Sequence, residues 1–199
     1  MTENRREFNK QETVRHIRSV FMSLYAKDGI NSITINSLCK ACGIARSTFY
    51  LYFDDKFQVL ESVEDDLLAG LREINLEMEQ CDLDLVKNGK PLPNAYATVR
   101  FLNENSEAFK ALLGKYGDPR FTYKWKKDIQ NNFMERFRVE KGNARSAGIA
   151  CTIFSSSLVG LYTHFLFDMP KVTNHEFSII LGNLLKYSLF DFHAFAKGD

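Results

Sequence analysis

The sequence predicts an all-α protein on the strength of two observations. Apolar residues recur at three- and four-residue spacing along nearly the whole chain, as they do on one face of a helix. Only four of the 199 residues are proline, so long helices are permitted. No run with the two-residue period of a strand is present. We therefore expect about nine helices, arranged as a three-helix N-terminal domain and a larger C-terminal helical domain.

Three helices are expected in the N-terminal domain. The first carries an apolar stripe and ends at Asp28, with Gly29 in the left-handed cap position. Thr34 stands where an N-cap belongs and predicts the start of a second helix, which Gly43 ends. A third, short helix is expected over residues 46–53. Two short helices joined at a glycine are typical of a helix-turn-helix, whose second helix enters the major groove of DNA.

The rest of the chain predicts further helices separated by short breaks. Residues 55–80 predict a long fourth helix, and the glycine- and proline-containing segment 87–93 predicts a linker. We place the domain boundary after residue 56, so that residues 1–56 form the helix-turn-helix domain and residues 57–199 the second domain. The helices expected in the second domain after the linker cover residues 94–103, 106–113, 119–139, 144–167 and 173–195.

Charge is distributed unevenly along the chain. Residues 1–56 hold nine basic and six acidic residues, whereas residues 57–80 hold seven acidic residues and one arginine. A basic head followed by an acidic segment would direct one end of the protein toward phosphates, although a solvated helix surface has the same pattern. The net charge of +1 excludes neither reading, since DNA binding needs only a local basic face.

The sequence is that expected of a cytoplasmic protein. No segment approaches the ~20 consecutive apolar residues that a membrane-spanning helix needs. The N-terminal residues are polar and lack the apolar core of a signal peptide. The four cysteines lie among apolar neighbours, as buried reduced thiols do.

Catalysis and metal binding find no support in the sequence. Cys39 and Cys42 form a C-x-x-C pair, which a redox switch or a zinc half-site would also show. A structural zinc site needs four ligands, and no second close pair of cysteine or histidine lies nearby, so we interpret the pair as core packing. No activated-nucleophile motif and no metal-ligand spacing is present. We expect no enzyme activity, no cofactor and no metal.

The segment from Thr34 to Lys56 carries the side chains suited to DNA. Arginine reaches phosphates or guanine edges, short hydroxyls donate to phosphates, and a tyrosine ring packs against a thymine methyl. Phe49 and Phe53, four residues apart, are expected to face the core. The candidate DNA-binding residues are Thr34, Arg46, Ser47, Thr48, Tyr50, Tyr52 and Lys56.

This segment resembles the DNA-binding domain of the TetR/AcrR family of bacterial transcriptional regulators. The resemblance covers about residues 10–60, and its specific core is the run Thr48-Phe49-Tyr50-x-Tyr52-Phe53-x-x-Lys56. The resemblance implies an all-helical homodimer that binds double-stranded DNA and whose larger domain binds a small-molecule effector. The chain departs from the family pattern at Ala45, where serine is usual, and at Ser47, where glycine is usual. The first departure removes the side-chain N-cap of the third helix.

The expected function is that of a sequence-specific transcriptional regulator, a repressor released from a palindromic operator by a small-molecule effector. The alternative is a helical regulator or interaction module that acts without such an effector. Aromatic side chains of the second domain suit an apolar effector pocket, although a histidine in a helix is more often simply hydrogen-bonded. The candidate pocket residues are Phe101, Phe109, Tyr116, Phe121, Trp125, Phe154, Tyr162 and His164.

The last two expected helices suit dimerisation, because they combine small residues with a large apolar area. They could instead be buried within the monomer. A helix-turn-helix protein gains from two-fold symmetry, so we favour a homodimer. The candidate interface residues are Ile153, Ser157, Leu161, Phe165, Phe177, Leu181, Leu184 and Leu185.

Overall fold

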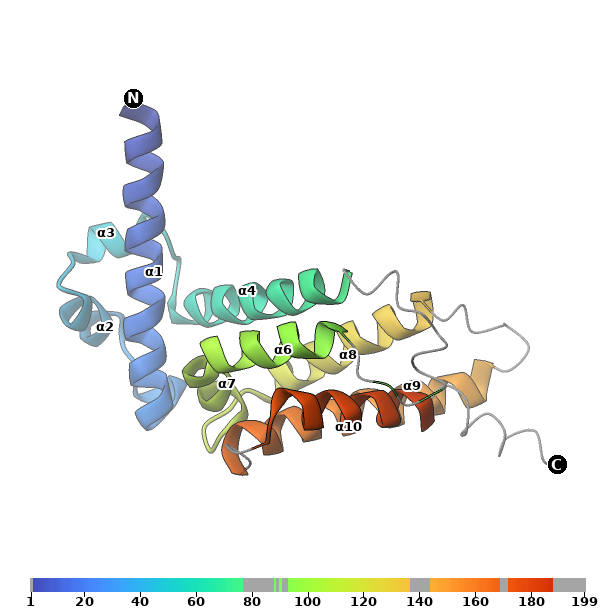
Figure 1. The fold of residues 1–199 in the computed structure, drawn as a ribbon. Coiled ribbons are helices and arrows are strands. Elements are labelled where there is room, and N and C mark those ends of the chain that lie inside the picture. The colour runs from blue at the N-terminus through green and yellow to red at the C-terminus, as the bar shows by residue number, and fades with distance from the viewer. Residues whose placement is uncertain are drawn as a thin grey trace. The chain divides into compact units, whose positions relative to one another are not determined.

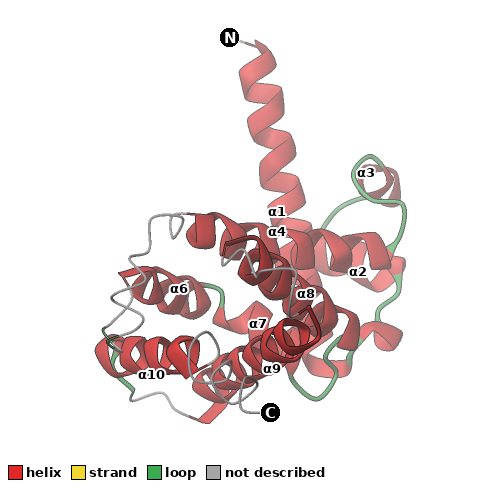
Figure 2. Cartoon of the chain, turned by 90° about the vertical axis from the view of Figure 1, so that its right-hand side faces the viewer, coloured by secondary structure: helices red, strands yellow, loops and turns green. Residues whose placement is uncertain are grey.

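The computed structural model describes residues 2–76, 88, 90, 93–136, 144–168 and 172–187. All regular structure in these residues is helical, which confirms the all-α prediction (Figures 1 and 2). In chain order the elements are α1 (Thr2–Asp28), the 3-10 turn η1 (Ile30–Ser32), α2 (Ile35–Cys42), α3 (Arg46–Tyr50), α4 (Lys56–Leu76), α6 (Pro93–Glu104), α7 (Ser106–Leu113), α8 (Pro119–Arg136), α9 (Ala144–Asp168) and α10 (Asn174–Lys186).

The chain divides into two compact units. The first unit comprises Met1–Leu67 and Glu107–Asp118, and the second comprises Leu68–Ser106 and Pro119–Asp199. The segment Glu107–Asp118 therefore belongs with the N-terminal helices, although the residues on both sides of it along the chain belong to the second unit. The domain boundary expected after residue 56 stays a prediction.

The core of the first unit forms where α1 meets α2 and the residues around α3. Ile17, Phe21 and Tyr25 of α1 are at most 1% exposed, and Leu38 and Phe49 are fully buried as well. The side chain of Tyr25 donates a hydrogen bond to the backbone oxygen of Tyr116, at 2.8 Å. This bond ties α1 to the segment that follows α7.

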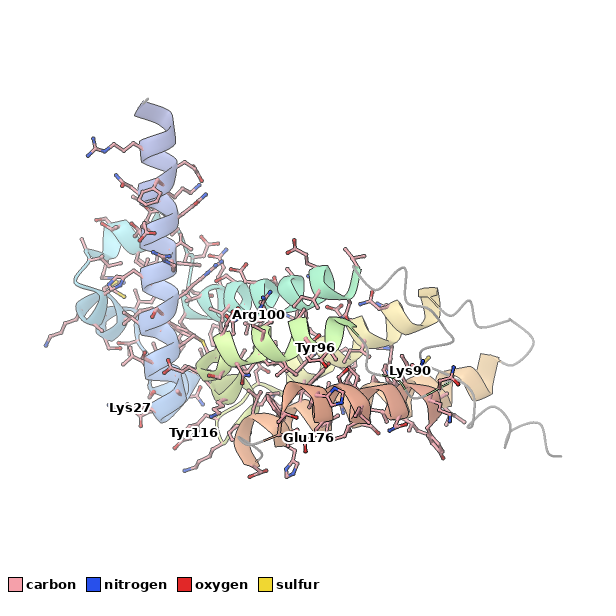
Figure 3. The ribbon with its side chains drawn as sticks, viewed as in Figure 1. Lys27, Lys90, Tyr96, Arg100, Tyr116 and Glu176 are labelled. Atoms are coloured by element: carbon pink, nitrogen blue, oxygen red, sulfur yellow. The ribbon has the colours of Figure 1, made fainter. Side chains whose placement is uncertain are left out.

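Gly29 ends α1 with a different geometry from the one expected. Its φ is +73°, as predicted, but its ψ of 176° lies outside the left-handed helical region, so the residue is not the expected helix cap. A Cβ at this position would lie 3.2 Å from the ring of Tyr116, which lies near the end of α1 (Figure 3). The close approach of Tyr116 and the positive φ both favour glycine.

α2 begins and ends where the sequence predicts. The Thr34 hydroxyl accepts a hydrogen bond from the Ser37 amide, and the Ser37 hydroxyl accepts one from the Thr34 amide, both at 3.0 Å. This reciprocal capping box satisfies two amides that the helix leaves without partners. Gly43 has φ +67° and ψ 29°, the left-handed conformation that ends α2 and turns the chain toward α3.

α3 is shorter than expected, since it ends at Tyr50 rather than at residue 53. Ala45 occupies its N-cap position and makes no side-chain cap, as the sequence predicts. Phe49 is fully buried and Phe53 is 5% exposed, which confirms the expected core-facing pair. The backbone leaves the helix at Leu51, but the turn still keeps Phe53 in the core.

The second unit is organised around stacked aromatic rings. The Trp125 ring in α8 lies parallel to the Tyr162 ring in α9, with 5.5 Å between their centroids. Tyr162 stacks in turn on Phe177 of α10 at the same distance. Arg72 and Asp128 form an ion pair of 2.6 Å between α4 and α8. A Cβ on Gly70 would collide with the ring of Phe101, so α4 and α6 approach closely there.

Within the described residues, one helix is long and apolar enough to cross a membrane by length and composition. It covers Gly148–Asp168 of α9 and has a mean hydropathy of 1.4. The expectation that no segment approaches this measure is therefore wrong. Half of the most apolar stretch is buried within the protein, as in the core helix of a helical bundle. The high apolar content of α9 reflects its packing between α8 and α10.

Several expected features fall wholly or partly outside the described residues. Apart from the end of α3, every helix end that the structure describes lies within one residue of the predicted end. The features outside the described residues are the predicted C-terminal ends at residues 80, 139 and 195, and most of the linker over residues 87–93.

Candidate nucleic-acid interface

The exposed face of α3 is formed by Arg46, Ser47 and Tyr50, while Phe49 points into the core. Ser47 and Arg46 are exposed, and the Tyr50 side chain is 46% exposed. The Arg46 guanidinium donates a hydrogen bond to the Tyr50 hydroxyl at 3.1 Å. The Phe49 ring meets the Tyr50 ring edge-on, with 5.5 Å between centroids. A buried ring thus supports an exposed pair of polar groups one helical turn apart.

The Arg46–Tyr50 pair also has a cation–π component. The guanidinium carbon lies 5.8 Å from the centroid of the Tyr50 ring, within the range of such contacts. The hydrogen bond from Arg46 to the Tyr50 oxygen raises the pKa of the guanidinium. The pair therefore presents a permanent positive charge beside an aromatic ring, which suits a phosphate or guanine edge next to a thymine methyl.

The remaining predicted residues surround this face, but their hydroxyl and ammonium groups are engaged to different degrees. Thr48 of α3 and Tyr52, two residues after its end, are half-buried. Thr34 is exposed, but its hydroxyl is committed to the cap of α2. A DNA contact by Thr34 would have to be made alongside the capping bonds.

Lys56 has a structural role that the sequence analysis missed. Its ammonium donates hydrogen bonds to the backbone oxygens of Ile30 and Ile33, each at 2.8 Å. The side chain therefore links the first turn of α4 to η1 and to the residue before the cap of α2. An ammonium has three donors, so a phosphate contact by Lys56 stays a prediction. No sequence pattern marks the two carbonyls as its acceptors.

Two further residues of α1 hold the helix-turn-helix in place. His16 Nε2 lies 3.1 Å from the backbone oxygen of Cys42, at the end of α2. Arg18 donates to the Ser62 hydroxyl at 2.9 Å and also pairs with Asp66, both on α4. Neither contact could be predicted from the sequence, because each joins residues more than 20 positions apart.

The C-x-x-C pair lies in the core, as expected. Cys39 and Cys42 are 4% and 8% exposed, and both are free thiols. Burial raises the pKa of the Cys42 thiol, and the neighbouring Cys39 raises it further. Both effects favour the neutral thiol, which is neither nucleophilic nor a metal ligand. In the described part of the chain, no group of three histidine, cysteine or acidic residues could hold a metal ion.

The eight candidate pocket residues are divided between the two units, and their grouping into one pocket stays a prediction. Phe109 and Tyr116 belong to the first unit, and the other six belong to the second. Phe121, Trp125 and Tyr162 form a continuous series of ring contacts. Phe154 is also buried, Phe101 is half-buried, and His164 is exposed and bonded to Asp168 at 2.9 Å.

The eight candidate interface residues divide by burial. The chain itself buries four of them, and among these the Phe165 ring of α9 packs on the Phe177 ring of α10, with 5.2 Å between centroids. The buried four are Phe165, Phe177, Leu181 and Leu185. Ile153 and Ser157 are exposed, and Leu161 and Leu184 are half-buried. The apolar pattern of a helix cannot separate its inner face from an outer apolar face, which explains the mixture.

A buried scaffold, a short exposed helix and a glycine turn between two helices define a helix-turn-helix DNA-binding protein. Residues 17–63 match the sequence model of the family described as bacterial regulatory proteins, tetR family. The match places the helix-turn-helix segment of this chain among those of the TetR/AcrR family of transcriptional regulators. Its N-terminal helix-turn-helix is the family's DNA-binding domain.

The chain is also similar, over part of its length, to two curated transcriptional regulators. The chain is 23% identical over 105 residues to the HTH-type transcriptional regulator YxbF of Bacillus subtilis. It is 29% identical over 69 residues to the HTH-type transcriptional regulator AcrR of Shigella flexneri. These matches cover 53% and 35% of the chain, but only 27% and 32% of the two relatives.

The fold is similar to that of a tetR-family transcriptional regulator from Streptomyces coelicolor. The TM-score is 0.65 at 18% sequence identity, and the match covers 93% of this chain and 83% of that one. At this identity the likeness concerns the fold, which extends well beyond the DNA-binding segment.

Proposed function

We propose that the protein is a cytoplasmic, homodimeric repressor that binds a palindromic operator and is released from it by a small-molecule effector. The observation that carries the DNA-binding part is the Arg46–Tyr50 pair on the exposed face of α3. Together with Thr34, Ser47, Thr48, Tyr52 and Lys56, this pair would position α3 in the major groove. Phosphate contacts would orient the helix, and base-edge contacts would give the sequence preference.

Dimerisation would use the outer faces of α9 and α10. Exposed apolar side chains lie along both helices, and Ile153 and Ser157 lie one turn apart on α9. A Cβ on Gly160 would meet nothing within 4 Å, so a second copy could approach the backbone of α9 closely. The four buried candidate residues would support this face from beneath. The exposed apolar residues of the two helices are Ile149, Ile153, Phe167 and Ile180, and the exposed Tyr187 follows α10 directly.

Two-fold symmetry supports the palindromic operator. A dimer places two copies of α3 about one helical turn of DNA, ~34 Å, or a multiple of it apart. Release would follow if an effector favours a different separation of the two reading helices, since a ligand shifts the population toward the state it binds better.

The effector would bind among the aromatic residues of the second unit. Trp125 and Tyr162 are the favoured positions, because their parallel rings form the centre of the buried aromatic series. Burial raises the pKa of Tyr162, so its phenol stays protonated and remains a hydrogen-bond donor. Trp125 is the single tryptophan of the chain and serves as an internal fluorescence probe.

The direct test is selection of genomic DNA fragments by the purified full-length protein, followed by a mobility-shift assay. We expect recovery of fragments that share an inverted repeat. Candidate effectors suggested by the neighbouring genes are then titrated against the complex, with Trp125 fluorescence recorded on the same samples. If the protein retains no fragment, the operator-binding proposal fails. If it binds an operator that no bound ligand releases, the effector part fails.

A further inference from the structure

α1 begins far ahead of the helix-turn-helix core. It runs without a break from Thr2 to Asp28, but among the side chains that the structure describes Ile17 is the first that is buried. The family match also begins at residue 17. We call Thr2–Thr13 the N-terminal arm. At 1.5 Å per residue, α1 extends about 22 Å before Ile17. Figure 1 shows this end of α1 standing clear of α2 and α3.

One side of the arm continues the side of α1 that faces the end of α2. The contact between His16 Nε2 and the Cys42 oxygen fixes that side, because Cys42 immediately precedes the turn to α3. Stepping back by three and four residues from His16 reaches Thr13, Asn9 and Arg5, which share this side of the helix. Arg5 lies about 16 Å beyond His16 along the axis.

The described side chains of this side suit a phosphate backbone. Arg5 and Asn9 are exposed. Glu12, which lies next to them, is bonded to Arg15 at 2.7 Å, so its charge is compensated. Glu7 lies on the opposite side, since it is two residues from Arg5 and Asn9. The arm therefore presents the Arg5 guanidinium and the Asn9 amide on the side of α1 that faces the end of α2.

We propose that the N-terminal arm binds duplex DNA outside the half-site, with Arg5 and Asn9 contacting backbone phosphates. The proposal rests on the proposed operator binding and extends it. A reach of about 16 Å corresponds to about five further base pairs at 3.4 Å each. Flanking DNA thus contributes affinity through charge, and the arm lengthens the footprint without adding a base-specific contact.

The test compares two operator duplexes, one ending at the half-sites and one with about ten further base pairs on each side. Salt dependence of binding is measured for the full-length protein and for Arg5→Ala. The control is Lys27→Ala, which removes the same charge at the other end of α1 (Figure 3). Circular dichroism verifies that each variant keeps its helix content.

We expect the wild type to bind the long duplex more tightly than the short one. Arg5→Ala should lower the salt slope on the long duplex by about 0.9 per protomer and should leave the slope on the short duplex unchanged. Lys27→Ala should match the wild type on both. Equal behaviour of Arg5→Ala and the wild type on both duplexes overturns the arm proposal alone. Failure of the wild type to bind either duplex overturns operator binding as well.

A hydroxyl-radical footprint provides a second readout that does not depend on affinity. The wild type should protect the flanking backbone, and Arg5→Ala and Asn9→Ala should lose that protection while the half-site stays protected. Flank protection that persists in both variants contradicts the proposal.

Discussion

The Lys56 ammonium donates a hydrogen bond to the backbone oxygen of Ile33, at 2.8 Å. A second bond of the same length reaches Ile30. Ile33 immediately precedes Thr34, the N-cap residue of α2. Lys56, the first residue of α4, therefore links the start of α4 to the start of α2. The cation that the sequence assigns to DNA thus also holds the helix-turn-helix together.

Removing this link should destabilise the first unit. We expect Lys56→Ala to lower the free energy of unfolding by about 1–2 kcal/mol, because two charge-assisted hydrogen bonds to half-buried carbonyls are lost. Urea denaturation measures the change. Lys40→Ala, which removes an exposed lysine of α2, should leave the midpoint nearly unchanged. An unaltered midpoint for Lys56→Ala would show that the link carries no stability.

The same Lys56 variant tests the predicted phosphate contact. If the third donor of the ammonium reaches DNA, the salt slope of operator binding should fall by about 0.9 per protomer. A destabilised variant with an unchanged slope would assign Lys56 to positioning alone.

The Arg46–Tyr50 hydrogen bond should contribute to operator affinity but not to stability. Tyr50→Phe removes the hydroxyl that orients the guanidinium, so operator affinity should fall by about 1 kcal/mol. The exposed Tyr123, 63% exposed on α8, provides the matched control Tyr123→Phe. A double-mutant cycle with Arg46→Ala should give a coupling of about 0.5–1 kcal/mol. If the effects of the two substitutions on operator affinity simply add, the Arg46–Tyr50 hydrogen bond does not contribute to operator binding.

The hydrogen bond between Tyr25 and the Tyr116 backbone should stabilise the first unit. Tyr25 is 1% exposed. Tyr25→Phe therefore removes a buried hydroxyl and leaves the backbone oxygen of Tyr116 without this donor. We expect a loss of about 1 kcal/mol in the free energy of unfolding. Thermal unfolding of the variant, measured beside Tyr123→Phe, checks this. Equal stability of the two variants would contradict the expectation.

Cys42 should react slowly with thiol reagents in the folded protein. Its raised pKa lowers the thiolate fraction near pH 8, and burial blocks access. Because the pKa of Cys42 is higher in the folded than in the unfolded protein, the stability linked to this thiol is complete below the unfolded pKa. It falls as the pH rises from the unfolded pKa through the folded pKa. Alkylation followed by site-resolved mass spectrometry should show labelling of Cys42 only after urea is added. Rapid labelling of the native protein would disprove this view.

Local signals in the sequence located most of the helix ends. α7 occupies Ser106–Leu113, the range that the sequence predicts, and the Thr34 cap and the Gly43 turn follow from residue chemistry at single positions. The Ala45 position was also predicted to lack a side-chain cap. These features depend on neighbours within four residues, which a sequence displays directly.

Contacts between residues far apart in the sequence could not be predicted in this way. The acceptors of Lys56 are backbone oxygens 23 and 26 residues away, and any residue supplies such oxygens. Tyr116 lies 3.2 Å from where a Cβ of Gly29 would be, and no local pattern encodes this approach. Phe165 and Ile153 are both apolar residues of α9, but only Phe165 is turned into the protomer.

The central claim is that α3 reads DNA through Arg46 and Tyr50. Its most direct test is the affinity of the wild type and of Arg46→Ala/Tyr50→Ala for an operator recovered by selection. We expect the wild type to prefer that operator over random DNA, and the double variant to lose at least about tenfold in affinity while keeping its helix content. A double variant that binds the same operator as tightly as the wild type would contradict the claim.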